Sequence, residues 1–233
     1  MYPDLLNSYG DAGNVAILTH RLAARGFKAN VHPVSVKDKF EPDAYDIVLL
    51  GGGQFHEQSV VAEDLMRDKG AALKDYVHAG KVALLICGGY QLAGEYYVDD
   101  KGEREDGLGI LPIYSTSGDV RLIGNIVVEA ENGELYTGFE NHLGKTYIGD
   151  LQPLGRVVNG FGNNGEDGYE GCVFKNTYAT YMHGPLLSKN PEIADRMIET
   201  AFKLRGEDVK LEPIDDEWER LAKATQIRKI SEK

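Results

Sequence analysis

The residue of this 233-residue chain best placed for chemistry is Cys87, which ends an apolar run and is followed by two glycines. The run 82–86 is typical of a buried strand, and the segment from Tyr90 onward is typical of a helix. Glycines allow a sharp turn without a Cβ clash, and a helix start beside the sulfur favours the nucleophilic thiolate. This pattern predicts a cysteine nucleophile at a strand–turn–helix elbow, although a free cysteine is also a common small core residue.

Two further segments carry residue types that acyl transfer needs. Three glycines, 51–53, follow the apolar segment 46–50 and present backbone N–H groups suited to an oxyanion, unless they form only a tight loop. No G-x-G-x-x-G pattern or Walker lysine accompanies them, so a nucleotide is not predicted. His183 follows the strand-like segment 173–182 and precedes Gly-Pro, a position that suits a general base at the sheet edge.

The second cysteine and the other histidines do not form a recognisable metal site. Cys172 has no Cys-x-x-Cys partner, and no two histidines have metal-ligand spacing. We therefore predict no metal and no other cofactor. The histidines without an assigned role are His20, His32, His56, His78 and His142, of which His56 adjoins the glycine run.

Charge and composition exclude several classes of protein. The net charge of −12 disfavours binding to nucleic acid or to an anionic membrane surface. No apolar run reaches the length of a membrane span, and no secretory signal is recognisable, so neither membrane insertion nor export is predicted. Because two cysteines make no disulfide framework, the expected location is the reducing cytoplasm.

The order of the predicted elements indicates an α/β fold. Apolar residues have helical spacing over 14–25 and over 57–78, the latter interrupted near Gly70, and these segments alternate with strand-like ones. Such alternation is typical of a mostly parallel sheet with helices on both faces. The predicted strands are 29–34, 46–50, 81–86, 121–129, 137–141 and 173–182, and a further helix covers 191–205.

Five motifs together resemble the class I glutamine amidotransferases of the CobB/CobQ-like branch, nearest to the GatD-type glutaminase subunits of lipid II isoglutaminyl synthase. The motifs are Tyr-Pro-Asp-Leu-Leu-Asn-Ser-Tyr-Gly-Asp-Ala-Gly-Asn (2–14), Ile-Cys-Gly-Gly-Tyr-Gln (86–91), Arg-Leu-Ile-Gly-Asn-Ile-Val (121–127), Gly-Phe-Glu-Asn-His (138–142) and Tyr-Met-His-Gly-Pro (181–185). The resemblance extends to about Arg205. It implies a flavodoxin-like domain over 1–212 and a helical tail over 213–233. It also implies an opening strand ahead of the first motif, which this sequence lacks.

The resemblance implies a concrete activity. Cys87 would attack the side-chain amide of L-glutamine, and His183 would move the protons. Arg121 would hold the substrate α-carboxylate, for which a guanidinium is well shaped, although an exposed arginine is more often a surface ion pair. Ammonia would pass to a separate MurT-like Mur ligase that amidates the D-glutamate α-carboxylate of the peptidoglycan stem peptide. The remaining substrate-binding residues implied by the motifs are Gly52, Gly53 and Gly88, as oxyanion donors, and Gln91.

One departure from the wider family concerns the residue that orients the base. Many class I amidotransferases carry a glutamate two residues after the histidine, and Pro185 takes that place here. The sequence therefore shows a Cys–His dyad. We expect a carboxylate of the partner to complete it, unless a backbone carbonyl or a distant acid such as Glu140 orients His183.

The sequence leaves alternatives open for the whole chain and for its tail. One is another cysteine hydrolase on a similar sheet, such as a γ-glutamyl hydrolase or a DJ-1/PfpI-like enzyme. Another is a catalytically silent regulatory subunit. In the tail, apolar residues at helical spacing over 214–230 predict a helix that either covers the chain's own core or docks on the partner.

Overall fold

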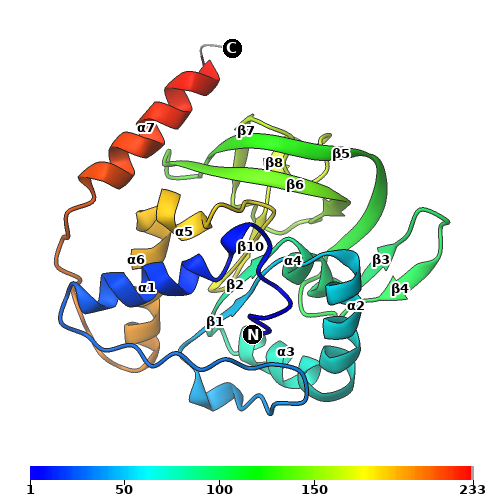
Figure 1. Cartoon of the computed structure of the whole chain (residues 1–233), viewed down its shortest axis with the longest axis horizontal. Coiled ribbons are helices and arrows are strands. Elements are labelled where there is room, and N and C mark those ends of the chain that lie inside the picture. Colours follow the sequence, from blue (N-terminus) through cyan, green and yellow to red (C-terminus); the bar gives the residue numbers. More distant parts are fainter. Residues whose placement is uncertain (232–233) are drawn as a thin grey trace.

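A four-stranded sheet lies at the centre of the computed structural model, which describes residues 1–231 (Figure 1). Its strands are β1 (Ile47–Leu50), β2 (Val82–Ile86), β10 (Thr177–Thr180) and β9 (Cys172–Phe174), in that spatial order. β2 pairs in parallel with β1 and β10, whereas β9 is antiparallel to β10. The carboxyl ends of β2 and β10 are neighbours. Cys87 and His183, which follow these two strands, therefore lie at the same end of the sheet.

Helices cover both faces of this sheet, as the sequence predicts (Figure 1). On one face lie α1 (Gly13–Ala23), α5 (Leu186–Lys189) and α6 (Pro191–Leu204), and on the other α2 (Phe55–Asp64), η3 (Leu65–Lys69), α3 (Gly70–His78) and α4 (Gly88–Leu92). Alternate side chains of β2 enter the two cores, Leu84 with the first group and Leu85 with the second. The predicted break near Gly70 is present, because η3 separates α2 from α3. Two single turns, η1 (Ser8–Gly10) and η2 (Pro42–Ala44), precede β1.

Within residues 1–231, a second sheet contains the six other strands. Its order is β4 (Arg104–Asp106), β3 (Tyr96–Val98), β5 (Tyr114–Glu129), β7 (Gly155–Asn159) and β8 (Tyr169–Glu170), with β6 (Leu135–Tyr147) paired to β5. The short strands predicted at 121–129 and 137–141 are parts of the long β5–β6 hairpin. The segment 173–182 holds parts of two strands rather than one, because Lys175 turns the chain with a φ of 53°. A bridge between Phe139 and His183 joins the hairpin to the sheet edge that carries Cys87.

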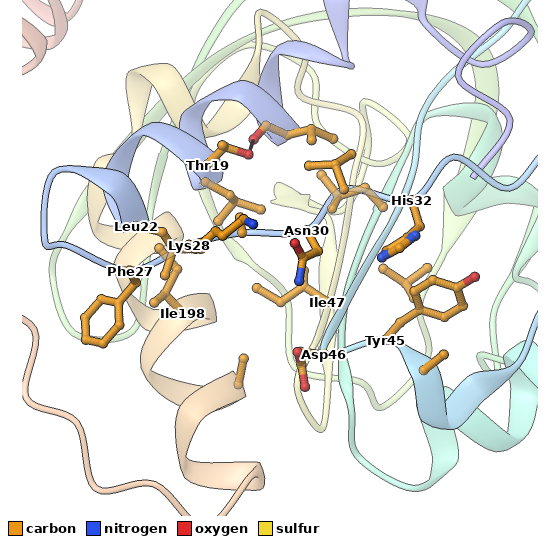
Figure 2. Close-up of a pocket in the computed structure, with 18 of the residues that line it drawn as sticks. Thr19, Leu22, Phe27, Lys28, Asn30, His32, Tyr45, Asp46, Ile47 and Ile198 are labelled. Carbon is orange, nitrogen blue, oxygen red and sulfur yellow. Dashed lines mark hydrogen bonds between the residues drawn. The ribbon is translucent and has the colours of Figure 1, made fainter.

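The strand predicted at 29–34 does not form. A cavity of about 490 Å³ is lined both by this segment and by β1 (Figure 2). The two backbones do not pair, since β2 is the strand neighbour of β1. A strand without a neighbour leaves its backbone groups to solvent, which explains the irregular conformation. Val31 is 57% exposed, whereas Val34 is buried. Residues of α1, α6 and several loops form the rest of the cavity wall, and neither Cys87 nor His183 contributes to it.

The final helix of the described residues is α7 (Glu217–Ser231), which begins later than the sequence predicts. Its Lys223 forms an ion pair with Glu192 of α6. Trp218 is 75% exposed and Leu221 is 55% exposed, so the helix does not bury these two side chains against the chain's own core. None of the helices within residues 1–231 is long and apolar enough to cross a membrane.

Candidate active site

Cys87 occupies the turn between β2 and α4, as predicted, and its backbone is strained. Its φ of 51° and ψ of −103° lie outside the regions that non-glycine residues normally adopt. The Cys87 N–H donates to the Thr180 carbonyl at 2.8 Å, which ties the turn to β10. The turn also requires Gly89, where an added Cβ would lie 2.7 Å from the Leu50 carbonyl oxygen. A strained turn of this kind presents a nucleophile at the end of a strand.

The second cysteine has a different environment. Cys172 in β9 is fully buried, and burial raises the pKa of its thiol to about 12. A thiol with so high a pKa stays protonated and unreactive at neutral pH. Both cysteines are free, but Cys87 is only partly buried, and it is the better nucleophile of the two.

His183 lies next to Cys87 beside the glycine loop. An added Cβ at Gly52 would be 3.0 Å from both the Cys87 Cβ and the His183 Cε1, so the two side chains meet at that point. The His183 ring is buried, and its Nε2 completes no hydrogen bond with a described residue. Burial lowers the pKa of His183, but the neighbouring Asp11 and Cys87 outweigh burial and raise it to about 10.

The carboxylate of Asp11 faces the other ring nitrogen of His183. The His183 Nδ1 lies 3.0 Å from Oδ1 and 3.2 Å from Oδ2, and both side chains are almost fully buried. An acid of this chain therefore lies beside His183, although none stands at the usual spacing in the sequence, because folding brings together two residues that are 172 positions apart. Glu140, the internal acid considered from the sequence, instead accepts hydrogen bonds from the N–H groups of Phe161 and Gly162.

The sequence contained one signal for Asp11, its place in the first motif, 2–14. The sequence analysis assigned it no role of its own. In the structure the Asp11 side chain faces His183, and α1 has no side-chain cap.

The N–H groups of the glycine loop are not equivalent. Gly52 N–H donates to Asp11 Oδ2 at 2.9 Å, which corrects the expectation that this group faces a substrate oxyanion. Gln58 of α2 lies against two other glycines, since its Nε2 donates to the Gly53 carbonyl at 2.6 Å and an added Cβ at Gly88 would be 2.7 Å from its amide. The N–H groups of Gly53 and Gly88 stay predicted oxyanion donors.

Arg121 is connected to the site through two intermediate side chains. It is exposed on β5, and its Nη1 donates to the side-chain oxygen of Asn141 at 2.9 Å. The Asn141 amide donates in turn to the hydroxyl of Tyr9, and the Tyr9 ring lies 4.9 Å from the His183 ring. Arg121 is therefore linked to the His183 ring through Asn141 and Tyr9, and its role toward the substrate stays a prediction.

Gln91 and His142 are both engaged in packing around Tyr181. The Gln91 Nε2 donates to the Tyr181 hydroxyl at 3.1 Å, and its substrate-binding role stays a prediction. The His142 ring stacks on Tyr181 with centroids 3.6 Å apart, and its Nδ1 is 2.7 Å from the Gly144 carbonyl oxygen. Within residues 1–231, no group of three or more histidine, cysteine, aspartate and glutamate side chains is arranged to hold a metal ion.

A comparison with protein families identifies the class to which this fold and site belong. Residues 1–191 match the model of the CobB/CobQ-like glutamine amidotransferase domain, and the chain belongs to that family. The resemblance of the five motifs is thereby confirmed. The structure of PurLQS from Thermotoga maritima has the same fold, with a TM-score of 0.55 and 18% identity, covering 89% of this chain and 96% of that one. The predicted flavodoxin-like α/β class is confirmed as well.

Two curated relatives are similar over nearly the whole chain. GatD, the glutamine-hydrolysing subunit of lipid II isoglutaminyl synthase from Streptococcus pneumoniae, is 43% identical over 220 residues, 93% of this chain and 84% of the relative. GatD from Staphylococcus aureus is 41% identical over 224 residues, 96% and 91% of the two chains. A probable cobyric acid synthase from Methanothermobacter thermautotrophicus is 37% identical over 113 residues, which is 42% of this chain and 22% of that protein.

Proposed function

We propose that this chain is a glutaminase subunit that hydrolyses L-glutamine to glutamate and ammonia through a thioester on Cys87. The observation that carries the proposal is the meeting of two side chains beside Gly52, Cys87 at its strained turn and the buried His183. The similarity to two GatD subunits, which are named as glutamine-hydrolysing, supports the same substrate.

The reaction has two half-reactions, and Cys87 and His183 act in both. In the first, the Cys87 thiolate attacks the side-chain amide carbon of glutamine, and His183 gives its proton to the nitrogen as the C–N bond breaks and ammonia leaves. In the second, His183 takes a proton from water, the water oxygen attacks the thioester carbon, and His183 returns the proton to the Cys87 sulfur as the C–S bond breaks and glutamate is released. The N–H groups of Gly53 and Gly88 would stabilise the oxyanion in both.

The acceptor of the ammonia is proposed from the relatives. Because GatD is named as a subunit of lipid II isoglutaminyl synthase, we propose a MurT-like Mur ligase as the partner, which amidates the D-glutamate α-carboxylate of the stem peptide. We propose a cytoplasmic location, because the mechanism needs Cys87 as a free thiol and both cysteines are free. No nucleic acid or cofactor takes part in this scheme.

Substitution of the nucleophile tests the proposal directly. In the Cys87→Ser variant, ammonia release from L-glutamine should fall to background, because serine lacks a readily formed anion at neutral pH. The matched control is Cys172→Ser, which also removes one sulfur but should keep most of the activity. Release of ammonia at the wild-type rate by the Cys87→Ser protein would falsify the assignment.

Labelling separates this function from the two alternatives. A glutamine-like diazoketone should alkylate Cys87, and L-glutamine in excess should protect it, as detected by mass spectrometry. Labelling that glutamine does not block would favour another hydrolase, such as a γ-glutamyl hydrolase. Absence of labelling in the complex with the ligase subunit would favour a catalytically silent regulatory subunit.

A further inference from the structure

Three contacts fix the position of the Asp11 carboxylate in the site. Its two oxygens lie 3.0 and 3.2 Å from the His183 Nδ1, and Oδ2 also accepts the Gly52 N–H at 2.9 Å. The side chains of Asp11 and His183 are 2% and 0% exposed. The carboxylate is therefore held between the base and the glycine loop, and water does not separate it from either.

The turn that carries Asp11 does not need this carboxylate for its own shape. The Asp11 N–H donates to the Ser8 carbonyl at 3.2 Å, and the Asn14 N–H donates to the Asp11 carbonyl at 3.0 Å. The Ser8 N–H donates to the Gly52 carbonyl at 3.0 Å, so main-chain bonds alone already join the turn to the glycine loop. Turn formation therefore leaves the burial of a charged group beside His183 unexplained.

We propose that Asp11 is the positioning residue that orients His183, an inference that rests on the proposed function of Cys87 and His183. A carboxylate that accepts a hydrogen bond from Nδ1–H fixes the ring tautomer and turns Nε2 toward Cys87. Asp11 also stabilises the imidazolium that forms when His183 takes the thiol proton. The orienting acid comes from the first motif of the same chain, so a carboxylate of the partner is not required.

The titratable groups around His183 are few. Asp11 lies within hydrogen-bond distance of it, Cys87 lies beside it next to Gly52, and the ring of Tyr9 packs on it. The Lys189 ammonium lies next to the following residue, where an added Cβ on Gly184 would be 3.1 Å from Nζ. Of these, only Asp11 places a carboxylate within hydrogen-bond distance of the ring. Loss of its charge should therefore make the imidazolium form of His183 less stable, and the Cys87 thiolate that pairs with it less stable as well.

The test is Asp11→Asn with two independent readouts. The amide oxygen of asparagine can still accept the Gly52 N–H, so the loop contact is kept while the charge is lost. We expect the pH midpoint of Cys87 alkylation by iodoacetamide to move upward by about one pH unit or more. We expect kcat for ammonia release to fall by on the order of 10²- to 10⁴-fold, with KM changed less than about threefold. The matched control is Asp4→Asn, an exposed acid of the same motif, which should change neither readout.

A second variant keeps the inference testable if the first does not fold. Asp11→Glu retains the charge, and its alkylation midpoint should stay closer to the wild-type value than that of Asp11→Asn, or than that of Asp11→Ala if the asparagine variant aggregates. An unchanged alkylation profile in a folded variant without the charge would overturn the role of Asp11. Because alkylation needs no glutamine, this readout is separate from the proposed function, which fails instead if the wild-type protein and its ligase complex release no ammonia.

Discussion

Replacing Gly52 with alanine adds one methyl group at the point where the proposed nucleophile and base meet. The added Cβ would lie 3.0 Å from the Cys87 Cβ and 3.0 Å from the His183 Cε1, and 3.5 Å from Asp11 Oδ2. Gly52 does not adopt a positive φ, so alanine suits its backbone. The substitution therefore tests the steric effect on the two side chains without added backbone strain.

The size of the effect follows from these distances. Carbon atoms in contact prefer separations of about 3.5–4.0 Å, so Cys87 and His183 must each move by about 0.5–1 Å, or the loop must move instead. A misplacement of about 1 Å in a reacting group costs on the order of 10²-fold in rate, or about 2.7 kcal/mol in activation free energy. Overpacking of a dense site costs about 1–3 kcal/mol in the free energy of unfolding.

The assay measures kcat for ammonia release together with the melting temperature of Gly52→Ala. The matched control is Gly155→Ala in β7, where the added Cβ is equally crowded, 2.9 Å from the Glu129 carbonyl oxygen and 3.0 Å from Val128 Cγ2. The control should lose stability but keep kcat, because it lies in the second sheet. If Gly52→Ala melts normally and keeps wild-type turnover, then Cys87 and His183 do not act together at Gly52, and the reasoning is refuted.

Two further predictions concern the substrate and the tail. Arg121→Lys should raise KM for glutamine about tenfold or more with little change in kcat, because lysine keeps the charge but cannot form the paired contact with a carboxylate; steady-state kinetics that show an unchanged KM would remove Arg121 from the binding site. Deleting residues 217–233 keeps the ion pair of Arg21 with Asp216 and removes exposed Trp218 and Leu221. We expect melting of the isolated chain to change by only a few degrees and binding to the ligase subunit to weaken, as measured by calorimetry; a large loss of melting temperature with normal binding would show that α7 instead supports the chain's own core.

The elements nearest to Cys87 were predictable because their signals are local. An apolar run, a cysteine and two glycines are consecutive in the sequence, and they form β2, the strained turn and α4. The alternation of helices and strands likewise predicts the layered sheet, since it depends only on hydrophobic periodicity within each segment. The strand at 29–34 was mispredicted for the opposite reason, because a strand also needs a paired neighbour, and β1 does not pair with this segment.

By itself, the sequence determined the family, the nucleophile candidate and the base candidate, because each is carried by a short run of neighbouring residues. Only the tertiary structure decided which groups surround them. Asp11 lies beside His183 although the two are 172 positions apart in the sequence. It also accepts the hydrogen bond of the Gly52 N–H, which the sequence analysis had assigned to the substrate oxyanion. A contact of this kind has no local pattern, since it depends on how the first turn, the glycine loop and the end of β10 pack together.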